Sequence, residues 1–182
     1  MVNKTVKDLM IPLGDYALVP TGTTVLDAIR ILRRTQASLP PDRQPPRAVL
    51  IIDRQKEVIG QLGHLDFLRA LEPKYNMLGD LNSLSRAGVS NEIIGTLIDN
   101  LSFWQGDISD ACQRAKSVVV DEIMHPLTET IEDSAPLSEA IHKIVMWQTM
   151  RILVTRKKIV VGVLRLADLF DEAADCLDKL DA

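Results

Sequence analysis

Two carboxylates, Asp66 and Asp168, have the best-defined chemical setting in this sequence. Each follows a glycine by six residues, after a β-rich run and at the expected start of a helix. A carboxylate offers two acceptor oxygens, so it can hold two adjacent hydrogen-bond donors. The plainer alternative is that each acid caps its helix, where the free N–H groups and the helix dipole favour it. The repeated spacing keeps both interpretations open.

The position three residues before each acid differs between the two stretches, being Gly63 in the first and Arg165 in the second. The guanidinium of Arg165 is a planar cation that can bind a phosphate through two parallel hydrogen bonds. We expect Arg151, at the head of the preceding strand, to point into the same cleft. Gly63 has no side chain, but its backbone leaves N–H groups near a helix start open to an anion. The alternative for both arginines is exposure to solvent or pairing with Asp171 or Glu172.

No residue pattern points to catalysis, so we expect neither a catalytic residue nor a metal site. His64, His125 and His142 are scattered and have no acid, cysteine or second histidine at ligand spacing. The sequence has no nucleophile elbow, no phosphate-binding P-loop and no paired Cys-x-x-Cys. Cys112 and Cys176 are too few for a disulfide framework, and we expect both to be small buried side chains.

The elements that must position these residues occur twice, because two passages of the sequence are repeated. Residues 6–12 return as 120–126, each ending in Met-x-Pro, and residues 58–66 return as 160–168. Between them lie an extended piece, a helix and a β-hairpin of equal length in the two copies. The unit reads β-α-β-β-α, twice, and its nearly continuous β-branched runs predict sheets covered on both faces. We therefore predict an α/β (α+β) fold of two repeats about a pseudo-two-fold axis.

Hydrophobic spacing sets the expected bounds of these elements. The first helices begin near Val25, with Thr23 or Thr24 as N-cap, and near Leu137, behind Ser134 and Pro136. The strands are expected at 49–52, 58–59, 152–154 and 159–161, and the closing helices at 65–71 and 166–177.

Two segments depart from simple duplication. Residues 39–47 contain four prolines, which exclude regular structure there. Residues 73–117 carry apolar residues at helical spacing and predict a connector of two or three helices. Its three stripes are Leu78, Leu81 and Leu84; Ile94, Leu97, Ile98 and Leu101; and Ile108, Ala111, Cys112, Ala115 and Val119. We divide the chain into a first repeat (1–72), the connector (73–117) and a second repeat (118–182).

The composition limits the kinds of partner that we expect for this protein. The 182 residues carry a net charge of −4, which gives no general attraction to nucleic acid. No apolar run approaches the ~20 residues needed to cross a bilayer, and the first residues do not form a signal peptide. We expect a cytoplasmic protein with neither membrane insertion nor nucleic-acid binding.

The sequence resembles a tandem pair of cystathionine β-synthase (CBS) domains over about 6–71 and 118–177. The resemblance rests on the two Met-x-Pro openings, on Asp27-Ala28 and Glu139-Ala140 in the first helices, and on the two Gly-x-x-x-x-x-Asp closings. It implies two clefts related by the pseudo-axis, no required cofactor, and further association into a homodimer. Such pairs act as regulatory modules, and the length predicts a stand-alone pair.

In family members that bind nucleotide, the closing acid holds the ribose hydroxyls, and a Ser or Thr three residues earlier binds phosphate. The resemblance therefore assigns the ribose role to Asp66 and Asp168, while Gly63 and Arg165 depart from the hydroxyl. The sequence favours the cleft of Asp168 and Arg165.

The sequence and the resemblance together predict two alternative functions. The first is a sensor that binds AMP, ADP, ATP, S-adenosylmethionine or a related ligand between the repeats and signals to a protein partner. The alternative is a ligand-independent dimeric scaffold with degenerate nucleotide sites.

Overall fold

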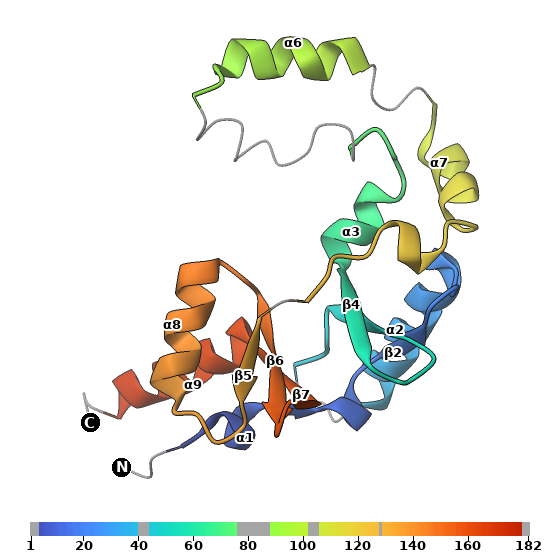
Figure 1. The fold of residues 1–182 in the computed structure, drawn as a ribbon. Coiled ribbons are helices and arrows are strands. Elements are labelled where there is room, and N and C mark those ends of the chain that lie inside the picture. The colour runs from blue at the N-terminus through green and yellow to red at the C-terminus, as the bar shows by residue number, and fades with distance from the viewer. Residues whose placement is uncertain (1–3, 40–43, 76–87, 102–105, 128, 180–182) are drawn as a thin grey trace.

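Two sheets that pack face to face form the centre of the molecule (Figure 1). The computed structural model describes residues 4–39, 44–75, 88–101, 106–127 and 129–179. The contact between the sheets is built from Tyr16, Leu50, Leu153 and Val163, all buried. Helices cover the outer faces, so the predicted α/β fold of two repeats with a helical insertion is confirmed.

The first repeat supplies a three-stranded sheet in the order β2-β3-β4. Strand β2 runs parallel to β3, and β3 is antiparallel to β4. The hydroxyl of Thr24 caps the first helix by accepting from the N–H of Asp27 at 3.2 Å. The elements are β2 (Leu18–Pro20), α2 (Val25–Ser38), β3 (Ala48–Ile52), β4 (Val58–Gly63) and α3 (His64–Arg69).

The second repeat has the same pairing pattern, with β5 parallel to β6 and β6 antiparallel to β7. Its first helix begins directly after Pro136, as predicted. The elements are β5 (Thr130–Glu132), α8 (Leu137–Trp147), β6 (Arg151–Arg156), β7 (Ile159–Arg165) and α9 (Leu166–Asp178).

Each Met-x-Pro segment packs on the repeat to which it does not belong in sequence. The first contains α1 (Val6–Leu9), β1 (Ile11–Pro12) and the 3-10 helix η1 (Leu13–Asp15), and β1 is the edge strand beside β7. The second contains the 3-10 helix η2 (Val120–Glu122), after which His125 bridges to Gln61 on β4. Val6 and Val120, both fully buried, thereby enter the cores of the opposite repeats.

The repeated glycines make this exchange possible. A Cβ on Gly162 would stand 2.6 Å from the carbonyl oxygen of Ile11, and one on Gly60 would stand 2.8 Å from Sδ of Met124. The closing motif therefore needs glycine where the opposite Met-x-Pro segment crosses it.

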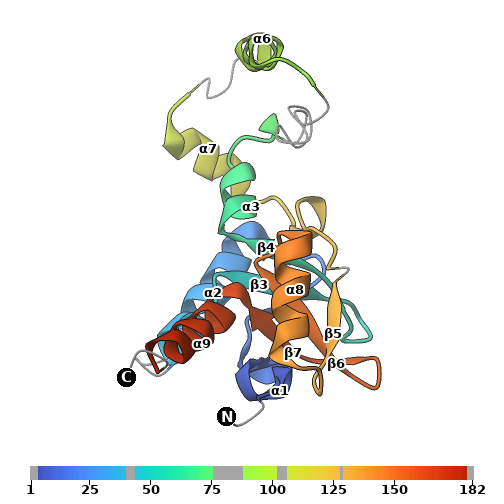
Figure 2. The same ribbon diagram turned by 90° about the vertical axis from the view of Figure 1, so that its left-hand side faces the viewer.

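The described part of the connector contains two helices, α6 (Asn91–Leu101) and α7 (Ile108–Ala115). Both views place α6 furthest from the sheets, beyond α7 (Figures 1 and 2). The stripe of Leu78, Leu81 and Leu84 lies outside the described residues. In the described ranges, no helix has the length and apolar character that crossing a bilayer requires.

The expectation of buried cysteines is wrong, because both are exposed. On α7 the buried side is formed by Ala111 and Ala115, and Cys112 is turned away from it by one position. On α9 the buried side chain is Leu169, and Cys176 lies along an open groove.

Candidate functional site

The two closing acids occupy equivalent places, each in the first turn of a helix that follows directly on a strand. Asp66 lies in α3, which starts where β4 ends at Gly63, and Asp168 lies in α9, which starts where β7 ends at Arg165. Asp66 is 9% exposed as a residue, and the Asp168 side chain is 17% exposed. The two acids nevertheless have different partners.

Asp66 caps its helix and also holds a histidine. Its Oδ2 accepts from the N–H of Gly63 at 2.7 Å, which is the expected capping role. Its Oδ1 lies 2.8 Å from Nε2 of His125. Two backbone hydrogen bonds with Gln61, of 2.9 and 3.1 Å, fix the His125 backbone beside β4. The His125 side chain stays about half exposed, so this contact can be exchanged for another donor.

Sequence reasoning missed His125. It is the middle residue of the second Met-x-Pro segment, where the first segment has Ile11. Its contact with Asp66 depends on the crossing of the opening segments between repeats, which no local pattern signals.

Arg151 comes from the second repeat, but its side chain lies beside Gly63 and Gln61 of the first repeat. Its Nη1 donates to Oε1 of Gln61 at 2.6 Å. A Cβ on Gly63 would stand 3.5 Å from Nη2 and 3.7 Å from Nη1 of Arg151, so the guanidinium lies directly over Gly63. A cation thus stands next to the position from which the side chain of residue 63 would project.

The expectation that Arg151 shares a cleft with Arg165 is wrong. The two residues are directly opposite on β6 and β7, and both side chains leave the sheet on the side facing the other sheet. Like charges in opposed positions repel, so the guanidiniums diverge. Arg165 turns back to its own helix, and Arg151 crosses to the first repeat.

Tyr16 lies within the field of both arginines, in the contact between the sheets. Burial raises the pKa of the Tyr16 hydroxyl, while the positive charges of Arg151 and Arg165 act in the opposite direction. The phenol therefore stays neutral in the contact between the two sheets.

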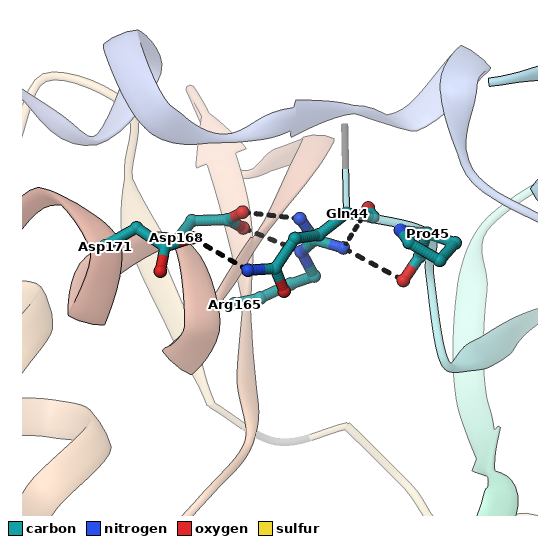
Figure 3. Close-up of polar contacts among 5 residues, drawn as sticks. All are labelled: Gln44, Pro45, Arg165, Asp168 and Asp171. Carbon is teal, nitrogen blue, oxygen red and sulfur yellow. Dashed lines mark hydrogen bonds and ion pairs between the residues drawn. The ribbon is translucent and has the colours of Figure 1, made fainter. Parts of the chain in front are cut away.

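Asp168 is held by Arg165 in a bidentate ion pair (Figure 3). Nε of Arg165 donates to Oδ2 at 2.7 Å, and Nη2 donates to Oδ1 at 2.5 Å. The Arg165 side chain is 12% exposed. Burial works to lower the pKa of Arg165, but the hydrogen bonds and charge of Asp168 outweigh it and raise that pKa above its ordinary value. Both carboxylate oxygens of Asp168 therefore already accept hydrogen bonds from Arg165.

Gln44 and Pro45, near the end of the proline-rich segment, contact this pair. Nη1 of Arg165 donates to the carbonyl oxygens of Gln44 at 2.8 Å and Pro45 at 3.3 Å. The side-chain amide of Gln44 donates to Asp171 at 2.9 Å, so the loop is tied to α9 at two points (Figure 3). We call this set of contacts the loop latch: Gln44, Pro45, Arg165, Asp168 and Asp171.

A small cavity of about 240 Å³ lies beside the loop latch. Its charged lining consists of four aspartates and one arginine, Arg165, which is already paired. Such a lining repels an anion. The lining residues are Asp8, Leu9, Met10, Ile11, Asp15, Leu39, Gln44, Pro46, Arg165, Asp168 and Asp171.

The five residues predicted from the sequence therefore divide between two groups, one around each closing acid. Gly63, Asp66 and Arg151 come together in the first, with His125, and Arg165 and Asp168 pair with each other in the second. Among the described residues, no group of three or more His, Cys, Asp or Glu side chains could hold a metal ion.

Comparison with known proteins assigns the fold. The family model of the CBS domain matches residues 6–73. Among curated proteins, no sequence match is found. Over nearly the whole chain the structure resembles solved CBS-pair proteins, so the chain has the fold of a tandem CBS pair.

Three solved structures show the extent of the likeness. CBSX2 in complex with AMP has a TM-score of 0.58 and 18% identity, and covers 94% of this chain and 97% of its own. CBSX2 from Arabidopsis thaliana has a TM-score of 0.61 and 17% identity, over 97% of this chain and 99% of its own. A putative acetoin utilization protein (AcuB) from Vibrio cholerae has a TM-score of 0.60 and 16% identity, over 99% and 97%.

Proposed function

We propose that the protein is a non-catalytic regulatory module that binds an adenosine nucleotide in the cleft of Asp66. The position of the Arg151 guanidinium over Gly63 is the observation on which this proposal rests. A cation there suits a phosphate, and the acid one helix turn away suits the ribose hydroxyls. The structure of CBSX2 with AMP, on the same fold, supports this ligand class.

The contacts around Asp66 suit an exchange of partners. Oδ2 keeps its bond to the Gly63 N–H, while Oδ1 trades His125 for a ribose hydroxyl. Arg151 then turns from the neutral Gln61 to the phosphate. Because His125 belongs to the opening segment of the second repeat, its release gives the bound state a different contact between the repeats. Such differential contacts are what a signalling module requires.

The cleft of Asp168 favours the alternative, a ligand-independent role, for its half of the molecule. A nucleotide entering it would have to break a bidentate ion pair and displace the loop carbonyls. It would also bring phosphate towards three further aspartates, Asp8, Asp15 and Asp171. We therefore propose one nucleotide per chain.

Calorimetric titration with AMP and with adenosine tests the proposal. Loss of a charge-assisted hydrogen bond costs about 1.5–3 kcal/mol, so we expect Arg151→Met to weaken AMP binding by about 10–150-fold. Adenosine, which lacks the phosphate, should bind the variant and the native protein alike. Asp66→Asn should weaken both ligands, since each has the ribose.

Arg156→Met is the matched control, because Arg156 ends the same strand and pairs with Asp133 far from either cleft. It should leave binding unchanged. The panel includes ADP, ATP and S-adenosylmethionine. Absence of binding by all five compounds at millimolar concentration, in protein freed of bound nucleotide, would leave the scaffold function. Loss of AMP binding in Asp168→Asn but not Asp66→Asn would move the ligand to the other cleft.

A further inference from the structure

The contact between His125 and Asp66 joins a titratable ring to the acid of the proposed nucleotide site. Nε2 of His125 lies 2.8 Å from Oδ1 of Asp66, and the His125 side chain is 53% exposed, so protons from solvent can reach the ring. The backbone of His125 is fixed separately, by its two hydrogen bonds with Gln61 of β4. The ring can therefore leave the carboxylate by rotation of its side chain alone, while its segment stays paired with β4.

The charged groups around this contact come from three elements. Asp66, in α3, is the acid that pairs with the ring. Arg151, in β6, donates to the side chain of Gln61, the residue whose backbone holds His125. Asp121, in η2 of the same opening segment, accepts a hydrogen bond from a backbone N–H at 2.6 Å. Because Asp66 is in direct contact with the ring, a proton on His125 acts most strongly on that carboxylate.

Protonation makes the ring of His125 a stronger competitor for Asp66. Histidine is the side chain whose ordinary change of charge falls between pH 5 and 8. A neutral ring offers one N–H to the carboxylate, whereas a protonated ring adds an opposite charge, which strengthens the hydrogen bond. Oδ2 of Asp66 already accepts from the N–H of Gly63 at 2.7 Å, so the ring and a ribose hydroxyl compete for Oδ1. The hydroxyl is a neutral donor and replaces a neutral histidine more readily than a charged one.

We propose that His125 is a pH-sensitive gate on the site of Asp66. The protonated ring holds the carboxylate and opposes binding of a nucleoside, and the neutral ring gives way to it. This inference rests on the proposed function, because it concerns the ligand of the same site. Affinity then rises with pH as histidine loses its charge, and by linkage the bound ligand drives a proton off the protein.

The second closing acid is held by a group that does not titrate in this range. In the first Met-x-Pro segment the place of His125 is taken by Ile11, which carries no charge. Asp168 is paired with Arg165, and an arginine keeps its charge wherever histidine titrates. The pH response is therefore expected from the site of Asp66 and not from the loop latch.

Calorimetric titration with adenosine, at pH values from about 5.5 to about 8.0, tests the gate. Adenosine is the probe because a phosphate group would itself titrate in this range. The native protein should bind adenosine about two- to fivefold more weakly at the lower pH, the effect expected of a partly exposed ion pair. Titrations in two buffers of different ionisation enthalpy should show the release of a fraction of a proton for each adenosine bound.

Two variants separate the charge of His125 from its presence. His125→Gln keeps a neutral donor but carries no charge, so it should bind adenosine equally at both ends of the pH range and release no proton. His125→Ala removes the competitor and should bind adenosine more tightly than the native protein at the lower pH. The matched control His142→Gln removes an exposed histidine of α8 and should keep the native pH dependence.

Three results would overturn the gate while the proposed function stands. The first is adenosine binding of equal strength at both ends of the pH range, and the second is a pH dependence that persists in His125→Gln. The third is weaker binding by His125→Ala throughout, which would make His125 a contact of the ligand and not its competitor. Absence of binding of both adenosine and AMP at every pH, in the native protein and in His125→Ala, would instead overturn the proposed function and the gate with it.

Discussion

Removal of Arg165 should destabilise the protein without weakening its binding of AMP. The side chains of Arg165 and Asp168 are 12% and 17% exposed, so each charge is largely withdrawn from water. Arg165→Met leaves the Asp168 carboxylate buried without its cation and releases two loop carbonyls. Breaking a fully buried pair costs about 3–5 kcal/mol, and the remaining exposure reduces this to about 2–4 kcal/mol. For a chain of this length the melting temperature should fall by about 4–16 °C.

Thermal and chemical unfolding measure this effect, with Arg30→Met as control. Arg30 pairs with Asp27 at 3.1 Å, and the two side chains are 58% and 54% exposed. Solvent screens a pair that is exposed on both sides, so this variant should lose far less stability than Arg165→Met. The double variant Arg165→Met/Asp168→Leu removes both charges and should recover part of the loss.

Two results would contradict this account of the loop latch. Equal destabilisation by Arg165→Met and Arg30→Met would mean that the buried pair contributes nothing beyond an exposed one. A tenfold or larger loss of AMP affinity in Arg165→Met, with folding intact, would mean that this cleft holds the nucleotide.

Two further changes test the packing of the repeats. Gly162→Ala should destabilise the protein by about 2 kcal/mol or more in chemical unfolding, because the new Cβ would stand 2.6 Å from the carbonyl oxygen of Ile11. The control Gly14→Ala should change the stability little, because nothing lies within 4 Å of the Cβ it adds. Burial raises the pKa of Tyr16 above its ordinary value of 10.0, so the stability it contributes is complete below pH 10 and is lost as the pH rises further. Tyr16→Phe should therefore weaken the fall in stability above pH 10, and unchanged alkaline unfolding would contradict this.

The secondary structure and its duplication were predictable because they depend on local spacing. The apolar period of α2, its Thr24 cap, and the two hairpins of equal length are all visible in the sequence. The exchange of the opening segments was not predictable, because the pairing of β1 with β7 joins residues about 150 positions apart in the sequence. A short segment such as Met10-Ile11-Pro12 has the same local pattern whichever sheet it joins.

The candidate site was predictable residue by residue but not in its assembly. The spacing from glycine to acid singled out Asp66 and Asp168, and each lies in the first turn of the helix that follows its closing strand. Which residues contact the two acids depended on the directions in which the arginine side chains point. Arg151 reached the opposite repeat because Arg165, directly across the sheet, carries the same charge. His125 entered the site through a backbone bridge to Gln61 that only the folded pair contains.

The residue three positions before the closing acid explains why the two clefts differ. An arginine there, as in the second repeat, reaches the acid of its own helix turn and occupies both of its oxygens. A glycine there, as in the first repeat, leaves the acid with one exchangeable partner and makes room for a cation from the other repeat. The same backbone motif thus produces an internal ion pair between Arg165 and Asp168 in the second repeat. In the first repeat it leaves the Asp66 carboxylate near Arg151, which donates to the neutral amide of Gln61. Under the proposed function, this one difference at an equivalent position separates a structural cleft from a binding cleft.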